Sequence, residues 1–158
     1  MAREDVRPAS VPPKRGVTTL LGENKGQDYD EYSDALGKVR LWHFGHRISV
    51  FESSGGLVAA HAQFIIDWHR RHIETHPRPY YVFGNWSNLR AYNNDVRRML
   101  TEWQVQAAYE ELHVAHNSHL LAMSISIANS VLKSTVQVVP TEEALDDVFI
   151  AVKKRCGL

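Results

Sequence analysis

The segment 79–103 constrains the fold of this chain more strongly than any other part of the sequence. Its beginning, 79–83, is mostly aromatic or β-branched, a composition typical of a buried strand. A polar segment follows at 85–92, and the apolar residues after Asn93 recur with the spacing of one helix face. Such a junction between a strand and a helix is where α/β proteins often bind their ligands. We therefore predict a strand, a loop and a helix here, with the functional site in the loop.

The sequence on both sides continues the alternation of strands and helices. Runs at 38–44 and 47–51 alternate apolar with polar residues about a Gly45-His46 turn, which predicts a β-hairpin. The run 53–56, Ser-Ser-Gly-Gly, is expected to end the hairpin. Further strands are predicted at 111–115 and 135–139, and further helices at 56–73, from about 117 and from about 140. The order β-β-α-β-α-β-α-β-α predicts a single α/β domain with a mostly parallel sheet, an N-terminal hairpin and helices packed on the sheet.

Residues 1–37 differ in composition from the rest of the chain. They contain prolines, glycines and polar residues, and too little apolar material to pack alone. We expect a flexible N-terminal tail over 1–37 and a folded domain over 38–158.

The charge and cysteine content exclude several classes of function. The chain has 18 basic and 18 acidic residues, so no overall field attracts nucleic acid. No apolar run approaches the roughly 18 residues of a membrane span, and the first residues lack the apolar core of a signal peptide. We expect a cytoplasmic protein without a transmembrane segment. The single cysteine, Cys156, rules out an internal disulfide.

The candidate binding residues lie in the polar segment 85–94 and at the neighbouring helix starts. Trp86 and Tyr92 are anchors for a partner if they are exposed, because aromatic residues and Arg dominate binding hot spots, and otherwise they pack in the core. Replacing both with Ala is expected to leave the fold intact. The candidates are Asn85, Trp86, Ser87, Arg90, Tyr92, Asn93, Asn94, Arg97, Ser118 and His119.

No catalytic constellation can be assembled from these residues. Asp95 is the only acid near the segment, and its expected role is to stabilise the start of the helix. The motifs of nucleophile elbows, P-loops, zinc proteases and dinucleotide-binding folds are absent from the sequence. The run 53–56 resembles a phosphate-binding loop only weakly, since no Lys follows it, and a simple turn is favoured. We expect no enzymatic activity, no catalytic residue and no cofactor.

Two groups of histidines have regular spacing. Metal sites usually need three or four ligands with supporting hydrogen bonds, so solvated or capping histidines are favoured here and no metal site is predicted. His116 and His119 flank an expected helix start, which leaves open a response to pH or contact with an anion. The groups are His69, His72 and His76, and His113, His116 and His119.

The element order, Asn85-Trp86, Tyr92 and the helix sequence VRRMLTEW at 96–103 together resemble the STAS fold of anti-sigma-factor antagonists, the SpoIIAA-like domains. The resemblance covers about residues 38–155 and is closest to a little-described bacterial branch. In this family the helix after the third strand opens with Asp-Ser, and a partner kinase phosphorylates that serine. Asn93-Asn94 occupy the matching positions, and an amide cannot accept a phosphoryl group. The resemblance therefore implies partner binding without the phosphorylation switch.

Two functions of different classes follow. The resemblance favours a non-catalytic protein-interaction or regulatory module, whose partner is a regulator, a kinase-like protein or a second copy of the chain. The alternative is a small-ligand binder that holds an anion, a nucleotide or a lipid headgroup at helix N-termini through Arg90, Arg97 and His119.

Overall fold

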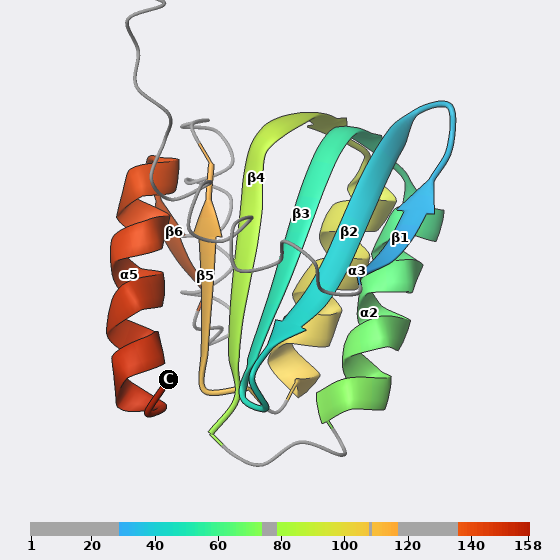
Figure 1. The fold of residues 1–158 in the computed structure, drawn as a ribbon. Coiled ribbons are helices and arrows are strands. Elements are labelled where there is room, and N and C mark those ends of the chain that lie inside the picture. Colours follow the sequence, from blue (N-terminus) through green and yellow to red (C-terminus); the bar gives the residue numbers. More distant parts are fainter. Residues whose placement is uncertain (1–28, 74–78, 108, 117–135) are drawn as a thin grey trace, which may run out of the picture.

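The computed structural model describes residues 29–73, 79–107, 109–116 and 136–158. These residues form a six-stranded sheet in which the spatial order of the strands is their order along the chain, β1-β2-β3-β4-β5-β6 (Figure 1). The strands are β1 (Asp30–Ser33), β2 (Gly37–Phe44), β3 (Ile48–Leu57), β4 (Tyr81–Tyr92), β5 (Glu111–Ala115) and β6 (Val136–Val139). The described helices are α2 (Ala59–Ile73), α3 (Asn94–Gln106) and α5 (Glu142–Arg155).

The strand directions confirm the predicted α/β class. β1, β2 and β3 pair antiparallel, and β3, β4, β5 and β6 pair parallel. The sheet is therefore mostly parallel with an antiparallel N-terminal part, as expected for strands joined by helical crossovers after an initial hairpin. The predicted helix from about 117 lies outside the described residues.

The helices cover both faces of the sheet (Figure 1). α2 and α3 pack on one face, here called the α2/α3 face, and α5 packs on the other, the α5 face. Side chains alternate between these faces along a strand. In β3, for example, Phe51 belongs to the core under α2 and α3, whereas Val50 belongs to the core under α5.

β3 and β4 are longer than the sequence predicts. The predicted loop 85–92 continues β4, and the run 53–56, expected to end the hairpin, continues β3. The two segments pair with each other as far as Leu57 and Tyr92, with register shifts after Glu52 and after Gly55. Each segment supplies the backbone hydrogen bonds that the other needs, so polar and Gly-rich sequence is held in extended form. For the same reason α2 begins at Ala59, not at 56.

The folded domain begins before residue 38, where the sequence predicted the boundary between a flexible tail and the domain. Asp30–Ser33 pair antiparallel with β2, so this part of the expected tail is a strand of the sheet. Tyr32 holds it against α2, with its ring 5.1 Å from that of His61 and 5.7 Å from that of Phe64. Residues 1–28 lie outside the described part of the chain.

Candidate functional site

The junction between β4 and α3 is built by a helix cap. Asn93 is extended (φ −90°, ψ 175°), and its Oδ1 accepts the N–H of Val96 at 3.0 Å, which confirms a helix start here. Val96 then packs into the core and fixes the helix against the sheet. Asn94, the first residue of α3, is exposed and so is Arg97. The cap therefore presents Asn94 and Arg97 on a rigid element.

Trp86 lies in the core and not at the surface. It is 6% exposed, and its ring centroid lies 6.0 Å from that of Phe51 and 6.3 Å from that of Tyr92. Tyr92 is half-buried, and burial raises the pKa of its phenol while the charge of Arg97 opposes that rise. The expectation that Trp86 and Tyr92 can be truncated without loss of the fold is therefore at odds with the packing of Trp86.

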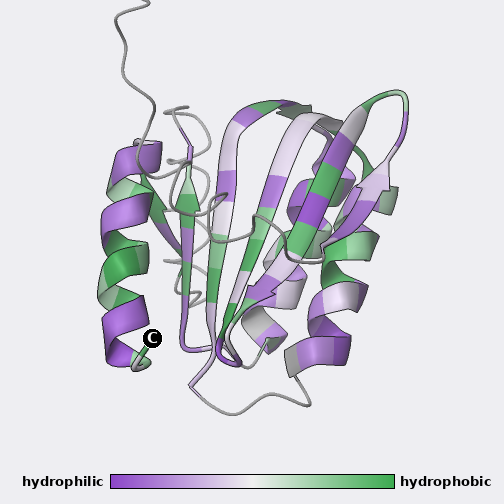
Figure 2. Cartoon of the chain, in the orientation of Figure 1, coloured by the Kyte–Doolittle hydropathy of each residue, from purple (hydrophilic) through white to green (hydrophobic). Residues whose placement is uncertain are grey.

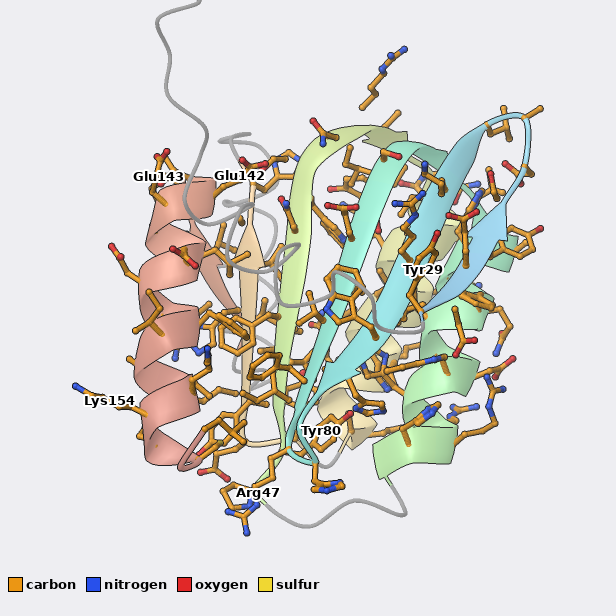
Figure 3. The ribbon with its side chains drawn as sticks, viewed as in Figure 1. Tyr29, Arg47, Tyr80, Glu142, Glu143 and Lys154 are labelled. Carbon is orange, nitrogen blue, oxygen red and sulfur yellow. The ribbon has the colours of Figure 1, made fainter. Side chains whose placement is uncertain are left out.

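Asn85 is also internal. It is 3% exposed on the α5 face, where its Nδ2 donates to Oε1 of Glu142 at 3.5 Å. Its Oδ1 accepts the N–H of Ser87 at 3.1 Å. Glu142 stands at the start of α5 (Figure 3), so Asn85 joins β4 to that helix. Asn85 is placed to position structure and not to meet a partner.

Asn85 closes a row of polar residues that crosses the sheet. The strand register aligns Glu31 with Arg40, Arg40 with Glu52, and Glu52 with Asn85. Nε of Arg40 donates to Oε1 of Glu31 at 2.7 Å. Burial raises the pKa of the Glu52 carboxyl, and the charges of Arg40 and Lys38 oppose that rise. The sequence signal for this row is the alternation of Lys38 and Arg40 with the apolar Val39 and Leu41 in β2, which places both cations on one face of the sheet and which the hairpin prediction left unused.

A second polar row lies nearer the end of the sheet and lines a cavity of about 500 Å³. Here the register aligns Lys38 with Ser54 and Ser54 with Asn88, and Arg90 contributes to the same lining. Figure 2 shows the corresponding change in hydropathy along β3, from a largely hydrophobic lower part to a mostly neutral upper part. Of these four residues, only Arg90 is a candidate predicted from the sequence, because the other three come together through strand pairing beyond the predicted hairpin and strand.

The sequence-predicted candidates thus separate into three sets. Asn85 and Trp86 are buried, and Ser87 and Tyr92 are half-buried. Ser118 and His119 lie outside the described residues. The exposed candidates, which we call the β4–α3 surface, are Arg90, Asn93, Asn94 and Arg97.

The described histidines of the first group, His69 and His72, have separate hydrogen-bond partners, although both rings contact Trp68. His69 lies between Oγ of Ser49 and the carbonyl of Ile65, and burial lowers its pKa to about 3. Nδ1 of His72 bonds the carbonyl of Trp68 at 2.7 Å. No group of three or more metal-ligating side chains occurs in 29–73, 79–107, 109–116 and 136–158.

His113 and His116 are held individually as well. Nε2 of His113 lies 2.8 Å from Oε1 of Glu111, and its ring stacks on Phe83 at 5.3 Å. Burial lowers the pKa of His116. The remaining members of the predicted groups, His76 and His119, fall outside the described residues.

The arrangement of sheet and helices defines a layered α/β protein with the SpoIIAA-like fold. The chain is similar to the crystal structure of an uncharacterised protein from Shewanella loihica PV-4, of the DUF3478 family, described as having a SpoIIAA-like fold. The TM-score is 0.56, with 9% identity over 74% of this chain and 98% of that one. At this identity the similarity establishes the fold, and it confirms the fold expected from the sequence.

Two other comparisons found nothing. No family model matches the chain, and no curated protein matches it. Among the described residues, no helix is both long and apolar enough to cross a bilayer.

Proposed function

We propose that this protein is a non-catalytic interaction module that recognises an acidic surface of a partner protein with its β4–α3 surface. The observation that carries the proposal is the placement of exposed amide and guanidinium groups on two elements held by the core. Arg90 lies near the end of β4, whose first six residues are buried, and Asn94 and Arg97 lie in the first turn of a helix whose Val96 is 1% exposed. A surface that is already ordered loses little conformational freedom when it binds.

The charge of this surface selects the kind of partner. Within the described part of the chain, Arg90 and Arg97 form no ion pair, whereas Asp95 lies 3.6 Å from Arg98. Two uncompensated cations favour a partner that presents carboxylates, and they also accelerate encounter with it. Regulators and kinase-like proteins remain the partner classes suggested by the fold resemblance.

The chemistry of the surface supports binding and not catalysis. Amide and guanidinium groups donate hydrogen bonds, but they do not act as nucleophiles or general bases near neutral pH. Asn94 stands where the SpoIIAA-like family has its phosphorylated serine. We therefore propose that binding here is not switched by phosphorylation of that position.

Site-specific crosslinking tests the proposal. A photo-crosslinking residue replaces Asn94 in one variant and Ile150, which is exposed on α5, in a control. The protein captured from position 94 is then purified, and its affinity is measured for wild type, Arg97→Glu and Lys154→Glu. Figure 3 shows Lys154 pointing away from the sheet, so it is a matched control for charge reversal.

We expect capture from position 94 alone, and a loss of affinity of at least about tenfold for Arg97→Glu but not for Lys154→Glu. Capture of the same proteins from positions 94 and 150, or an affinity that Arg97→Glu leaves unchanged, would refute the proposal.

A second candidate function, binding of a small anion, has its own supporting observation. Arg90 lines the polar cavity at the end of the sheet, beside Lys38. Of the two residues expected to hold such an anion together with Arg90, His119 lies outside the described residues and Arg97 does not line this cavity. Apart from Arg90, the cavity therefore supports this function through residues that the sequence did not suggest.

A further inference from the structure

The cavity lies at the end of the sheet where β1 connects to β2, at the top right of Figure 1. Its walls come from three separate parts of the chain: the connection around Asp34 and Leu36, the Gly-rich end of β3, and the last part of β4. Its volume, about 500 Å³, falls within the range of small-molecule sites. Its lining is mostly polar, unlike the apolar pockets that take hydrophobic ligands.

One wall of the cavity is a close backbone contact that depends on glycine. The N–H of Gly56 donates to the carbonyl of Leu36 at 2.9 Å. A Cβ on Gly37 would lie 2.3 Å from the carbonyl oxygen of Gly56, and Gly55 has a φ of +78°. Only residues without a Cβ allow the β1–β2 connection to lie this close to β3. The wall is therefore formed by the fold before any ligand binds.

The polar side chains of the cavity stand on adjacent strands. Lys38 faces Ser54 across β2 and β3, and Ser54 faces Asn88 across β3 and β4. Adjacent strands lie about 4.8 Å apart, so Lys38 and Asn88 flank Ser54 from its two sides. A small group placed over Ser54 is within reach of the long Lys38 side chain and of the Asn88 amide. Arg90 lies two residues beyond Asn88, next to a register shift, and lines the same space.

The two cations of the cavity are not held in ion pairs by the described residues. Lys38 and Arg90 form no ion pair with any of them. Asp34, the only carboxylate in the lining, accepts the N–H groups of Leu36 and Gly37 at 2.9 and 3.0 Å and lies 3.2 Å from Nε2 of His61. The bonds from Gly37 and Leu36 hold the pKa of Asp34 below its usual value, so its carboxylate stays ionised and is oriented by the turn. With Lys38 and Arg90 as the cations, the lining keeps an excess of positive charge.

One further acid lies close to Lys38. Glu52 belongs to the neighbouring polar row, and the charge of Lys38 acts on its carboxyl, whose pKa burial raises. Arg40 pairs with Glu52 in the register and acts on the same carboxyl more strongly than Lys38 does. Lys38 therefore remains available to a ligand in the cavity.

We infer that this cavity binds a phosphate monoester, held by Lys38 and Arg90 with hydrogen bonds from Ser54 and Asn88. Two cations match the two negative charges of the dianion. The Arg90 guanidinium can donate two parallel hydrogen bonds to phosphate oxygens, and Lys38 adds a point charge. The hydroxyl of Ser54 and the amide of Asn88 complete the donor set. The phosphate is carried either by a small metabolite or by a phosphorylated side chain of a protein.

The inference deepens the small-anion candidate and is separable from the partner proposal. Lys38 and Ser54 belong to the cavity alone, whereas Arg97 belongs to the β4–α3 surface alone. Lys38→Gln should therefore weaken phosphate binding and leave capture of an acidic partner in place. Arg97→Glu should weaken capture of the acidic partner and leave phosphate binding in place.

The test is a titration of the full chain followed by amide chemical shifts in NMR spectra. The probes are inorganic phosphate, adenosine 5′-monophosphate, and a short Gly-Ser peptide with and without one phosphoserine. Ionic strength is held constant with sodium chloride, so that general screening does not change. The variants are Lys38→Gln and Ser54→Ala, with Lys154→Gln as the control on α5, and thermal unfolding of each checks that it folds.

We expect saturable shifts at Lys38, Ser54, Asn88 and Arg90, and binding at least roughly tenfold weaker for Lys38→Gln than for Lys154→Gln. Tighter binding of the nucleotide than of the phosphopeptide identifies a metabolite as the source, and the opposite order identifies a protein. Absence of saturation, shifts located elsewhere, or equal affinity of Lys38→Gln and Lys154→Gln in folded variants would overturn the inference.

Discussion

Phe51 on β3 and Gly84 on β4 are register partners, and the ring of Phe51 fills the space above Gly84. A Cβ built on Gly84 would lie 2.4 Å from Cζ of Phe51. The same ring packs against Trp86, which continues β4 under α3. Glycine at position 84 thus allows an aromatic side chain to lie flat on the sheet just before the predicted binding segment.

Replacement of Gly84 by Ala is expected to destabilise the protein by about 1–3 kcal/mol, because the new methyl group forces the buried Phe51 ring to move. Without that contact, the same change in a strand would stabilise by roughly 0.4–1 kcal/mol. Urea unfolding measures the difference. The double variant Gly84→Ala with Phe51→Leu should recover part of the loss, and an increase in stability for Gly84→Ala alone would contradict the packing.

Replacement of Trp86 by Ala is expected to cost about 3–5 kcal/mol, because it removes a large core side chain and leaves a cavity. The measurement is the free energy of unfolding in urea, with the exposed Arg90→Ala as control. That control should change stability by no more than about 0.5 kcal/mol. If Trp86→Ala were as mild as Arg90→Ala, Trp86 would have to lie at the surface.

The buried, neutral His69 should make the folded protein less stable in mild acid. The carbonyl of Ile65 only accepts hydrogen bonds, so Nδ1 of His69 carries the proton and Nε2 accepts from the Ser49 hydroxyl. The folded pKa is about 3, against about 6.5 for an unfolded histidine. Between these values the unfolded chain binds one more proton, so stability falls by up to about 1.4 kcal/mol per pH unit as pH decreases.

The comparison that isolates this effect is urea unfolding of wild type and His69→Gln from pH 7.5 to pH 4.5. At pH 7.5 the variant is less stable than wild type, because the substitution changes the packing of the side chain and its two hydrogen bonds. Its deficit should shrink as pH falls below about 6.5, because glutamine takes up no proton. Two parallel curves would show that His69 is not kept neutral by the fold.

Glu52 should make the folded protein less stable as pH rises, which is opposite in sign to the effect of His69. Its folded pKa lies above the usual value, mainly because of burial, so its contribution to stability is present below pH 4.5 and is lost as pH rises through the folded value. Glu52→Gln should therefore raise the melting temperature at pH 7, and the advantage should disappear near pH 4. Glu110→Gln, at an exposed position, is the isosteric control. A lower melting temperature for Glu52→Gln at pH 7 would mean that the attraction of Arg40 outweighs burial.

The sequence by itself determined where α3 and α5 begin. The apolar spacing from Val96 to Trp103 places one face of α3 in the core, and Asn93 and Thr141 cap α3 and α5 as their side-chain chemistry suggests. These features are local, since a cap and a helix face depend on residues within a few positions of each other. The order of strands and helices then sufficed for the α/β class and the SpoIIAA-like fold.

Only the tertiary structure decided how far the strands extend and which polar residues meet. The run 53–56 and the segment 85–92 each resemble a loop alone, and they are strands because each satisfies the other's backbone. That pairing turns Trp86 into the core and brings Lys38, Ser54 and Asn88 into one row. Contacts between residues so distant in sequence leave no local pattern, so the cavity could not be found before the strands were paired.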